Sequence, residues 1–288
     1  MKILNLPGGG GAGYAVTNYL TKVEQELGHH PLKHVDLVAG VSTGAIIGTA
    51  LAYDMSAQQV QDFYLDLVPR LFKKRWPWNG WWKSARYSTQ VLEEALRKQL
   101  PVRWCELGRR VMVYATEVSP VIRPCHWKSW RVDHTDQAAD VILASAAAPV
   151  YFKPRELNGR VYVDGGVVNY DPLMDAVAEA LALGERLDDI EVLTLAPYGG
   201  EYSVPDAAKL GGALSWIPHM PLMFTEVDPM GSVYRGRQLL GERLTNVVFN
   251  TQTAMDDGSS AALQQMGDNA VKRWADIEQR EKVLNFLS

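Results

Sequence analysis

The turn Gly40-Val41-Ser42-Thr43-Gly44 holds a serine in the G-x-S-x-G pattern. An apolar stretch at 35–39 precedes the turn and small or apolar residues follow at 45–53, which predicts a strand before it and a helix after it. In that context the pattern is typical of a nucleophilic serine at the carboxyl edge of a sheet, where a helix N-terminus favours developing negative charge. A tight glycine turn with a helix-capping serine is the alternative.

A second glycine-rich loop, Gly8-Gly9-Gly10-Gly11-Ala12-Gly13, follows the first apolar stretch of the chain. Backbone N–H groups without neighbouring Cβ atoms can bind an anion. No Gly-Lys-Ser/Thr follows, which excludes a phosphate-binding P-loop. A dinucleotide loop fits the spacing, but the second strand does not end in the acidic residue that such a site requires. An oxyanion hole serving the serine is the simplest interpretation.

A serine nucleophile needs a base within hydrogen-bond reach. The turn Asp164-Gly165-Gly166 places a carboxylate after the short strand at 160–163. A histidine base, as in a Ser-Asp-His triad, would have to be His219, the only histidine in the second half of the chain. Its surroundings, SWIPHMPLMF, are typical of packing, and the chain has fewer strands before Ser42 than a triad hydrolase normally places there.

Four features in this order resemble the patatin-like phospholipase family: the glycine loop, G-x-S-x-G, the stretch Ala144-Ser145-Ala146-Ala147-Ala148-Pro149, and Asp-Gly-Gly. The resemblance extends from residue 3 to about residue 172. It implies a catalytic dyad in which Ser42 is the nucleophile and Asp164 the base, without a catalytic histidine. The oxyanion hole that it implies consists of the amides of Gly8, Gly9, Gly10, Gly11 and Thr43, with Gly40, Gly44, Gly165 and Gly166 shaping the turns.

The sequence departs from the family pattern at two places. Ala12 stands where the glycine loop usually carries Arg or Lys, which removes a positive charge near the oxyanion hole. The segment after Asp-Gly-Gly, usually similar to Asn-Asn-Pro, reads Asn169-Tyr170-Asp171-Pro172. Neither change affects the expected dyad.

The activity that the resemblance implies is phospholipase A-like: a serine carboxylic-ester hydrolase that acts on phospholipids or other acyl-ester lipids through an acyl-enzyme. We expect neither a metal nor a nucleotide cofactor. Two alternatives remain open, a catalytically weak lipid- or acyl-binding module and an acyltransferase that uses the same acyl-enzyme.

The elements that must position these residues alternate along the chain. We expect strands at 2–6, 35–39, 110–116, 160–163 and 190–196, and helices at 14–27, from 43 onward, and at 88–100, 136–147 and 173–183. Ser56 and Gln59 form a predicted capping box for a further helix at 56–68. This alternation predicts a single α/β domain over 1–288, a three-layer α/β/α fold with a mainly parallel central sheet. We expect the motifs in a core at 3–200 and a helical region at about 230–288, with a long polar helical region at 258–287.

The composition is that of an ordinary globular protein. Of 288 residues 47% are hydrophobic and 22% charged, and 29 Lys and Arg against 33 Asp and Glu give a net charge of −4. This balance provides no overall basic surface for nucleic acid. Cys105 and Cys125 lack zinc-site spacing and are expected to be reduced. No apolar run reaches the ~18 residues of a membrane span, so we expect a cytoplasmic protein, and peripheral attachment to a membrane stays open.

Two segments have alternative interpretations. Residues 70–86 contain six Lys or Arg, no acidic residue, and Trp76, Trp78, Trp81 and Trp82. Tryptophans and cations together favour an interfacial lid that contacts a membrane, whereas the alternative is a loop packed on the body of the protein. The apolar stretch 213–224, with Met220 and Met223, fits either core packing or the lining of an acyl channel.

Overall fold

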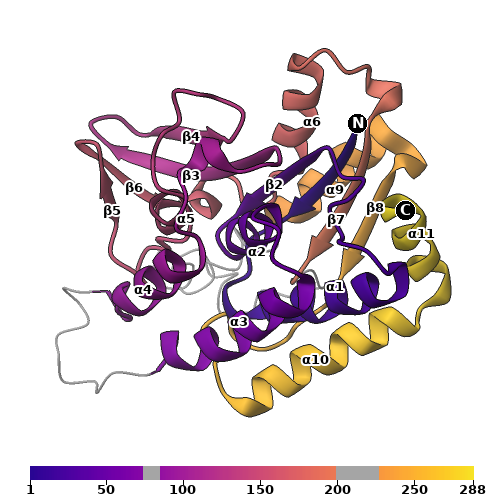
Figure 1. The fold of residues 1–288 in the computed structure, drawn as a ribbon, viewed down its shortest axis with the longest axis horizontal. Helices are drawn as coiled ribbons and strands as arrows, with labels where there is room; N and C mark the ends of the chain where they lie inside the picture. The colour runs from indigo at the N-terminus through magenta and orange to yellow at the C-terminus, as the bar shows by residue number, and fades with distance from the viewer. Residues whose placement is uncertain (74–84, 199–226) are drawn as a thin grey trace, which may run out of the picture.

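The computed structural model describes residues 1–73, 85–198 and 227–288, which fold around one sheet of eight strands (Figure 1). Seven strands follow the order β5-β6-β3-β2-β1-β7-β8, and β4 pairs with β3. All pairs between β3 and β8 in this order are parallel. The parallel strands are β1 (Lys2–Leu6), β2 (Leu37–Val41), β3 (Val111–Ser119), β7 (Glu191–Ala196) and β8 (Leu244–Val248).

The other end of the sheet is antiparallel. It consists of β4 (Arg123–Lys128), β5 (Arg155–Leu157) and β6 (Arg160–Asp164). Both β4 and β6 pair with β3 in the antiparallel direction. The sheet is therefore mixed but mostly parallel, in agreement with the predicted class.

Strand β3 brings the ends of β2 and β6 to adjacent positions. One edge of β3 is occupied by β4 over residues 112–117, so β2 and β6 share the opposite edge. On that edge Val41 of β2 pairs with Tyr114, and Asp164 of β6 pairs with the next residue, Ala115. Because β2 and β6 approach from opposite directions, the residues that end them lie beside each other.

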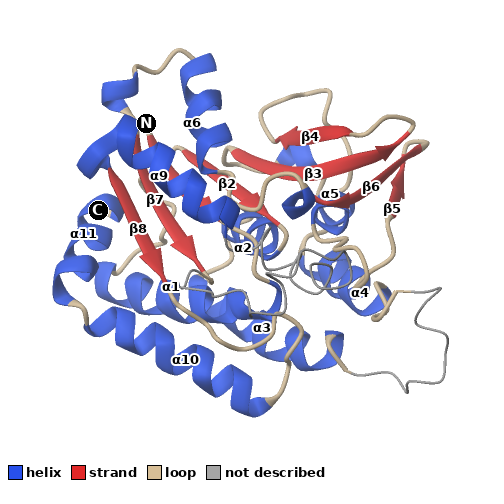
Figure 2. Cartoon of the chain, turned by 180° about the vertical axis from the view of Figure 1, so that it is seen from behind, coloured by secondary structure: helices blue, strands red, loops and turns tan. Residues whose placement is uncertain are grey.

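Helices cover both faces of the sheet and make the three layers that the sequence predicts (Figure 2). Along β1, Leu4 and Leu6 face the larger core, whereas Ile3 faces the smaller one. The larger core contains side chains of α1 (Gly13–Leu27), α2 (Thr43–Ala52), α3 (Ala57–Leu71), α4 (Gln90–Gln99), α5 (Ala138–Ser145), α10 (Ser260–Ala275) and α11 (Ile277–Leu287). The smaller core lies beneath α6 (Leu173–Ala182) and α9 (Asp228–Leu240).

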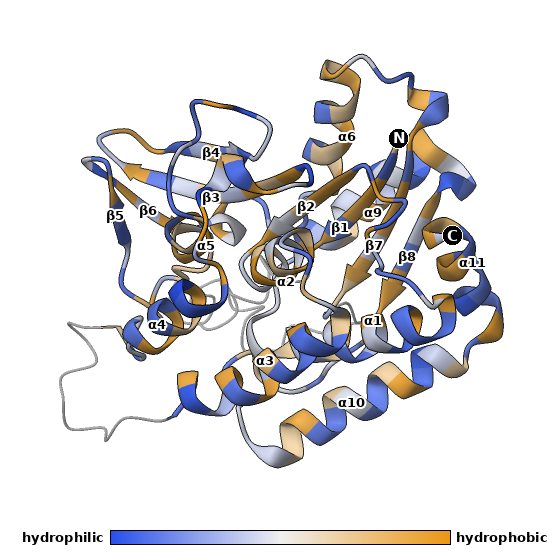
Figure 3. Ribbon diagram, viewed as in Figure 1, coloured by the Kyte–Doolittle hydropathy of each residue, from blue (hydrophilic) through white to orange (hydrophobic). Residues whose placement is uncertain are grey.

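Hydropathy follows this layering. In Figure 3 the central strands are largely apolar, while α10 alternates between apolar and polar residues, as expected of a helix with one face on the core. Short 3₁₀ helices complete the described elements: η1 (Gly10–Ala12), η2 (Trp104–Glu106), η3 (Gly165–Val167), η4 (Leu187–Asp189) and η8 (Gly241–Arg243). Within the described residues, no helix combines the length and apolar character that crossing a bilayer requires.

The capping box at the start of α3 is confirmed. The Ser56 hydroxyl accepts a hydrogen bond from the Gln59 amide at 3.1 Å, and the Gln59 side chain accepts one from the Ser56 amide at 2.8 Å. The helix continues past the predicted end at 68 and includes Pro69 in its last turn.

The predicted helical region at about 230–288 is wrong in one respect. It contains β8, which extends the parallel sheet beside β7. The polar helical region at 258–287 is confirmed and consists of two helices, because the Asp276 side chain accepts a hydrogen bond from the Gln279 amide at 3.1 Å and begins a new helix there. The sequence of β8, Leu-Thr-Asn-Val-Val, is short and half polar, so it lacks a clear strand pattern.

Candidate active site

Ser42 occupies a strained turn between β2 and α2. Its φ of 54° and ψ of −119° are unusual for a residue with a side chain. The flanking glycines permit this turn because neighbouring backbone leaves no room for a side chain: a Cβ on Gly40 would lie 2.6 Å from the Gly44 carbonyl oxygen, and one on Gly44 would lie 1.8 Å from the Leu6 carbonyl oxygen. The G-x-S-x-G pattern thus has the strand–turn–helix context that the sequence predicts.

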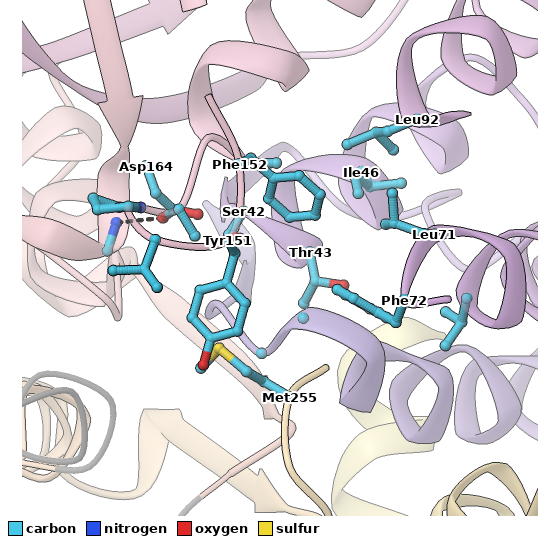
Figure 4. Close-up of a pocket in the computed structure, with 18 of the residues that line it drawn as sticks. Ser42, Thr43, Ile46, Leu71, Phe72, Leu92, Tyr151, Phe152, Asp164 and Met255 are labelled. Atoms are coloured by element: carbon cyan, nitrogen blue, oxygen red, sulfur yellow. Dashed lines mark hydrogen bonds between the residues drawn. The ribbon is translucent and has the colours of Figure 1, made fainter. Parts of the chain in front are cut away.

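Asp164 ends β6 in a buried position beside Ser42. Its side chain is 5% exposed, and its Oδ1 accepts a hydrogen bond from the Gly166 amide at 2.7 Å (Figure 4). Burial raises the pKa of this carboxyl to about 6, although the hydrogen bonds from the Gly166 amide and the Ser42 side chain act in the opposite direction. The two residues predicted as a dyad are therefore brought together, and the carboxylate is more basic than an exposed one.

The Asp-Gly-Gly turn packs tightly against β3. A Cβ on Gly165 would lie 2.5 Å from the Tyr114 carbonyl oxygen, and one on Gly166 would lie 2.8 Å from the Tyr170 ring. Both glycines are thus required by close approach. Gly166 also supplies the amide that holds Asp164.

The glycine loop after β1 is fixed at two of its amides. The Gly8 amide donates to the Tyr170 carbonyl at 3.1 Å, and the Gly11 amide donates to the Met255 carbonyl at 2.8 Å. These two amides therefore anchor the loop, which corrects their predicted place in an oxyanion hole. Gly9 and Gly10 line the same cavity as Ser42, and Gly10 has the left-handed φ of 53° that favours glycine.

Thr43 is the first residue of α2 and lines the cavity beside Ser42. Its hydroxyl shares a hydrogen bond with the Tyr64 hydroxyl, which also bonds the Thr43 carbonyl at 3.1 Å. Amides in the first turn of a helix have no partner within the helix. The amides of Thr43, Gly9 and Gly10 thus remain as candidate donors to an oxyanion.

A cavity of about 590 Å³ opens beside these residues. In Figure 4, Ser42 and Asp164 lie together, and Ile46, Leu71 and Leu92 lie toward the other side of the view. Most of the lining is apolar, which suits a hydrocarbon chain. The further apolar lining residues are Leu67, Val68, Phe72, Ala146, Ala148, Pro149, Val150, Tyr151, Phe152, Val167 and Met255.

Two features of the site were missed in the sequence. Arg86 lines the cavity and donates to Asp256 at 2.7 Å, and the Tyr87 hydroxyl donates to the same carboxylate oxygen at 2.8 Å. This ion pair ties residues after α3 to the loop whose Met255 carbonyl holds Gly11. No local pattern indicates it, because the partners are 170 residues apart in the sequence.

The second missed feature is another buried carboxyl. Asp171 is 1% exposed, and its Oδ1 accepts hydrogen bonds from the Asn5 side chain at 2.6 Å and the Leu173 amide at 3.1 Å. Burial raises the pKa of Asp171 to about 6 as well. A pH titration of the parent protein therefore includes both carboxyls, and the contribution of Asp164 is measured as the difference between the parent and an Asp164 variant.

Some of the other residues named in the sequence lie in parts of the chain that the structure does not describe. Trp76, Trp78, Trp81, Trp82 and the stretch 213–224, with His219, lie outside the described residues. Cys105 and Cys125 are free. In the described parts of the chain, no three His, Cys, Asp or Glu side chains gather in a way that could hold a metal ion.

Comparison with known proteins gives a consistent picture. A family model described as patatin-like phospholipase matches residues 4–177. A Pseudomonas aeruginosa protein named cGAMP-activated phospholipase is 30% identical over 63% of this chain, and the match spans 61% of that protein's length. An Escherichia coli protein of the same name is 26% identical over 100% of this chain and 92% of its own.

A solved structure shares the fold. VipD from Legionella pneumophila matches 99% of this chain and 66% of its own with a TM-score of 0.50 and 13% identity. This likeness concerns the arrangement of the elements.

We predict that Asp164→Asn stabilises the folded protein increasingly as pH rises. The carboxyl has a pKa of about 6 when folded and about 3.9 when unfolded, so the folded state binds more protons between these values and loses stability as pH rises through them. The difference in unfolding free energy between the variant and the parent should grow by about 2–3 kcal/mol from pH 4 to pH 8. Urea unfolding at several pH values measures this difference.

The control is Asp62→Asn, the same substitution at an exposed carboxyl on α3 that does not line the cavity. A difference that is independent of pH for Asp164→Asn would contradict the raised pKa.

Proposed function

This chain belongs to the patatin-like phospholipase family, and from that membership we propose that it is a phospholipase A-like acyl hydrolase with a Ser42/Asp164 dyad. The observation that carries the proposal is the pairing on β3, where the ends of β2 and β6 adjoin beside an apolar cavity. A nucleophile, a basic carboxylate and room for a hydrocarbon chain are the requirements for cleaving a lipid ester.

In the proposed first step, the Asp164 carboxylate takes the proton of the Ser42 hydroxyl as Oγ attacks the ester carbonyl carbon. The raised pKa of Asp164 supports this role because a base with a pKa near the working pH accepts a proton more readily. The protonated carboxyl then gives the proton to the leaving alcohol or lysolipid, and an acyl-enzyme remains. In the second step Asp164 activates water, which releases the fatty acid and restores Ser42.

The negative oxygen of each tetrahedral intermediate needs donors that are already in place. We assign this task to the amides of Gly9 and Gly10, with the Thr43 amide at the start of α2 as a further donor. Their support is the position of all three residues in the lining of the cavity with Ser42. Loss of one such donor typically costs about 10²- to 10³-fold in turnover, so the fixed loop is as important as the base.

We propose that the protein works at the surface of a membrane. Val150 and Val167 line the cavity and are 65% and 41% exposed, and Val168 beside them is 51% exposed. Exposed apolar side chains at the entrance to an apolar cavity favour contact with lipid.

Three other mechanisms must be distinguished from the dyad hydrolase. A silent acyl-binding module would release no product, and an acyltransferase would transfer the acyl group to an added alcohol in preference to water. A triad would require His219.

We predict that Ser42→Ala and Asp164→Asn each reduce fatty acid release from mixed phospholipid vesicles by at least about 10³-fold, because each removes a group that acts in bond cleavage. His219→Gln should keep most of the activity. Mass spectrometry of fatty acids and lysolipids, with and without an added alcohol, measures the outcome. Equal inactivation by His219→Gln and Ser42→Ala would favour the triad, and undiminished release by Ser42→Ala would refute the proposed site.

We also propose that a cyclic dinucleotide controls this activity. The support is the name of the E. coli relative, cGAMP-activated phospholipase, and the match over the whole of this chain. Adding cGAMP to the vesicle assay should raise the rate by at least about fivefold, the lower end of common allosteric couplings, while equimolar AMP and GMP should not. Equal rates with and without cGAMP would contradict activation by this compound.

A further inference from the structure

We propose that the segment 145–147 positions both members of the dyad, with Ser145 as a positioning residue for Ser42. This inference rests on the proposed function. The Ser145 hydroxyl accepts a hydrogen bond from the Ser42 amide at 2.9 Å, and the Ala147 carbonyl accepts one from the Asp164 amide at 3.0 Å. One short segment thus binds the backbone of the nucleophile and the backbone of the base.

The bond from Ser145 acts on the strained peptide of the turn. With φ at 54° and ψ at −119°, Ser42 holds a conformation that persists only when its surroundings fix it. The Ser42 amide belongs to the peptide group that precedes the Ser42 Cα. The orientation of that peptide group helps to set the direction in which the Cβ, and hence the hydroxyl, projects. An acceptor at that amide therefore fixes the direction of the nucleophile.

The segment is rigid enough for this task. Ser145 ends α5 and is 0% exposed, and Ala147 is 2% exposed. The Ala146 amide donates to the Ile142 carbonyl at 2.9 Å, and the Ala148 amide donates to the Ala146 carbonyl at the same distance. The bonds from Ser42 and Asp164 give the alanine-rich motif a role that its sequence alone does not indicate.

The two bonds have separable consequences. Removing the Ser145 hydroxyl leaves Asp164 bound to the Ala147 carbonyl and to the Gly166 amide, so the base keeps its position. Ser145 itself does not line the cavity, unlike Ala146 and Ala148. Substrate binding should therefore persist while the attack by Ser42 slows.

The test compares Ser145→Ala with the matched variant Ser129→Ala. Ser129 is also buried, and its hydroxyl accepts a hydrogen bond at 2.9 Å from the amide of Val111, the first residue of β3. Both variants lose a buried hydroxyl that accepts from a backbone amide at 2.9 Å, and Ser129→Ala also loses a bond of 2.7 Å to the Arg109 carbonyl. The assay measures kcat and KM with a soluble p-nitrophenyl acyl ester, together with thermal unfolding.

We expect Ser145→Ala to lower kcat by about 10²-fold, the cost of misplacing a reacting group by about 1 Å, with KM within threefold of the parent. The midpoint of the pH profile should not fall, because the hydrogen bond from Ser42, which this variant weakens, lowers the pKa of Asp164. Ser145→Cys, which keeps a weaker acceptor, should lie between Ala and the parent. Ser129→Ala should keep kcat within twofold and lose at least as much thermal stability, because it loses one bond more.

A parental kcat in Ser145→Ala, or an equal loss of kcat in Ser129→Ala, would overturn the positioning role. The Ser42→Ala variant separates this failure from a failure of the proposed function. If Ser42→Ala is inactive while Ser145→Ala is unimpaired, only the positioning role of Ser145 is refuted. If Ser42→Ala is fully active, both the positioning role and the proposed function are refuted.

Discussion

Strand β3 pairs along one edge with two strands that run in opposite directions, and the site depends on this pairing. Val41 beside Tyr114 and Asp164 beside Ala115 are consecutive positions of one ladder. Since neighbouring residues of a strand are about 3.3 Å apart along its axis, the residue after Val41 must lie near Asp164. The alignment of Ser42 and Asp164, the proposed nucleophile and base, is thus a property of hydrogen-bonded backbone rather than of flexible side chains.

The fold holds two unfavourable features at that meeting point. Ser42 has a strained backbone, and Asp164 is a buried carboxyl whose pKa burial raises to about 6. If the neighbouring residues could move, the Ser42 backbone would adopt a less strained conformation and the Asp164 carboxyl would become exposed to water. Close approaches at Gly44 and Gly165, and the bonds from Gly166 to Asp164 and from Ser42 to Ser145, prevent this. The surrounding structure therefore maintains a reactive arrangement at a cost in stability.

The sequence predicts those features that depend on residues close together in the chain. The α/β class, the elements around Ser42 and the capping box at Ser56 follow from periodicity and turn residues. Strand β8 was missed, and the occupied amides of Gly8 and Gly11 were assigned wrongly. Their partners, β7 and the carbonyls of Tyr170 and Met255, are distant in the sequence, and no local pattern specifies them.

The claim that Asp164 activates Ser42 is tested most directly by the rate at which a fluorophosphonate modifies Ser42 between pH 4 and pH 9. The account predicts a rate that rises with a midpoint near the Asp164 pKa of about 6 and then stays constant, because only the carboxylate accepts the proton. In Asp164→Asn the rate should be low at every pH. Rapid modification of Asp164→Asn, or a midpoint that disappears in His219→Gln, would contradict the account.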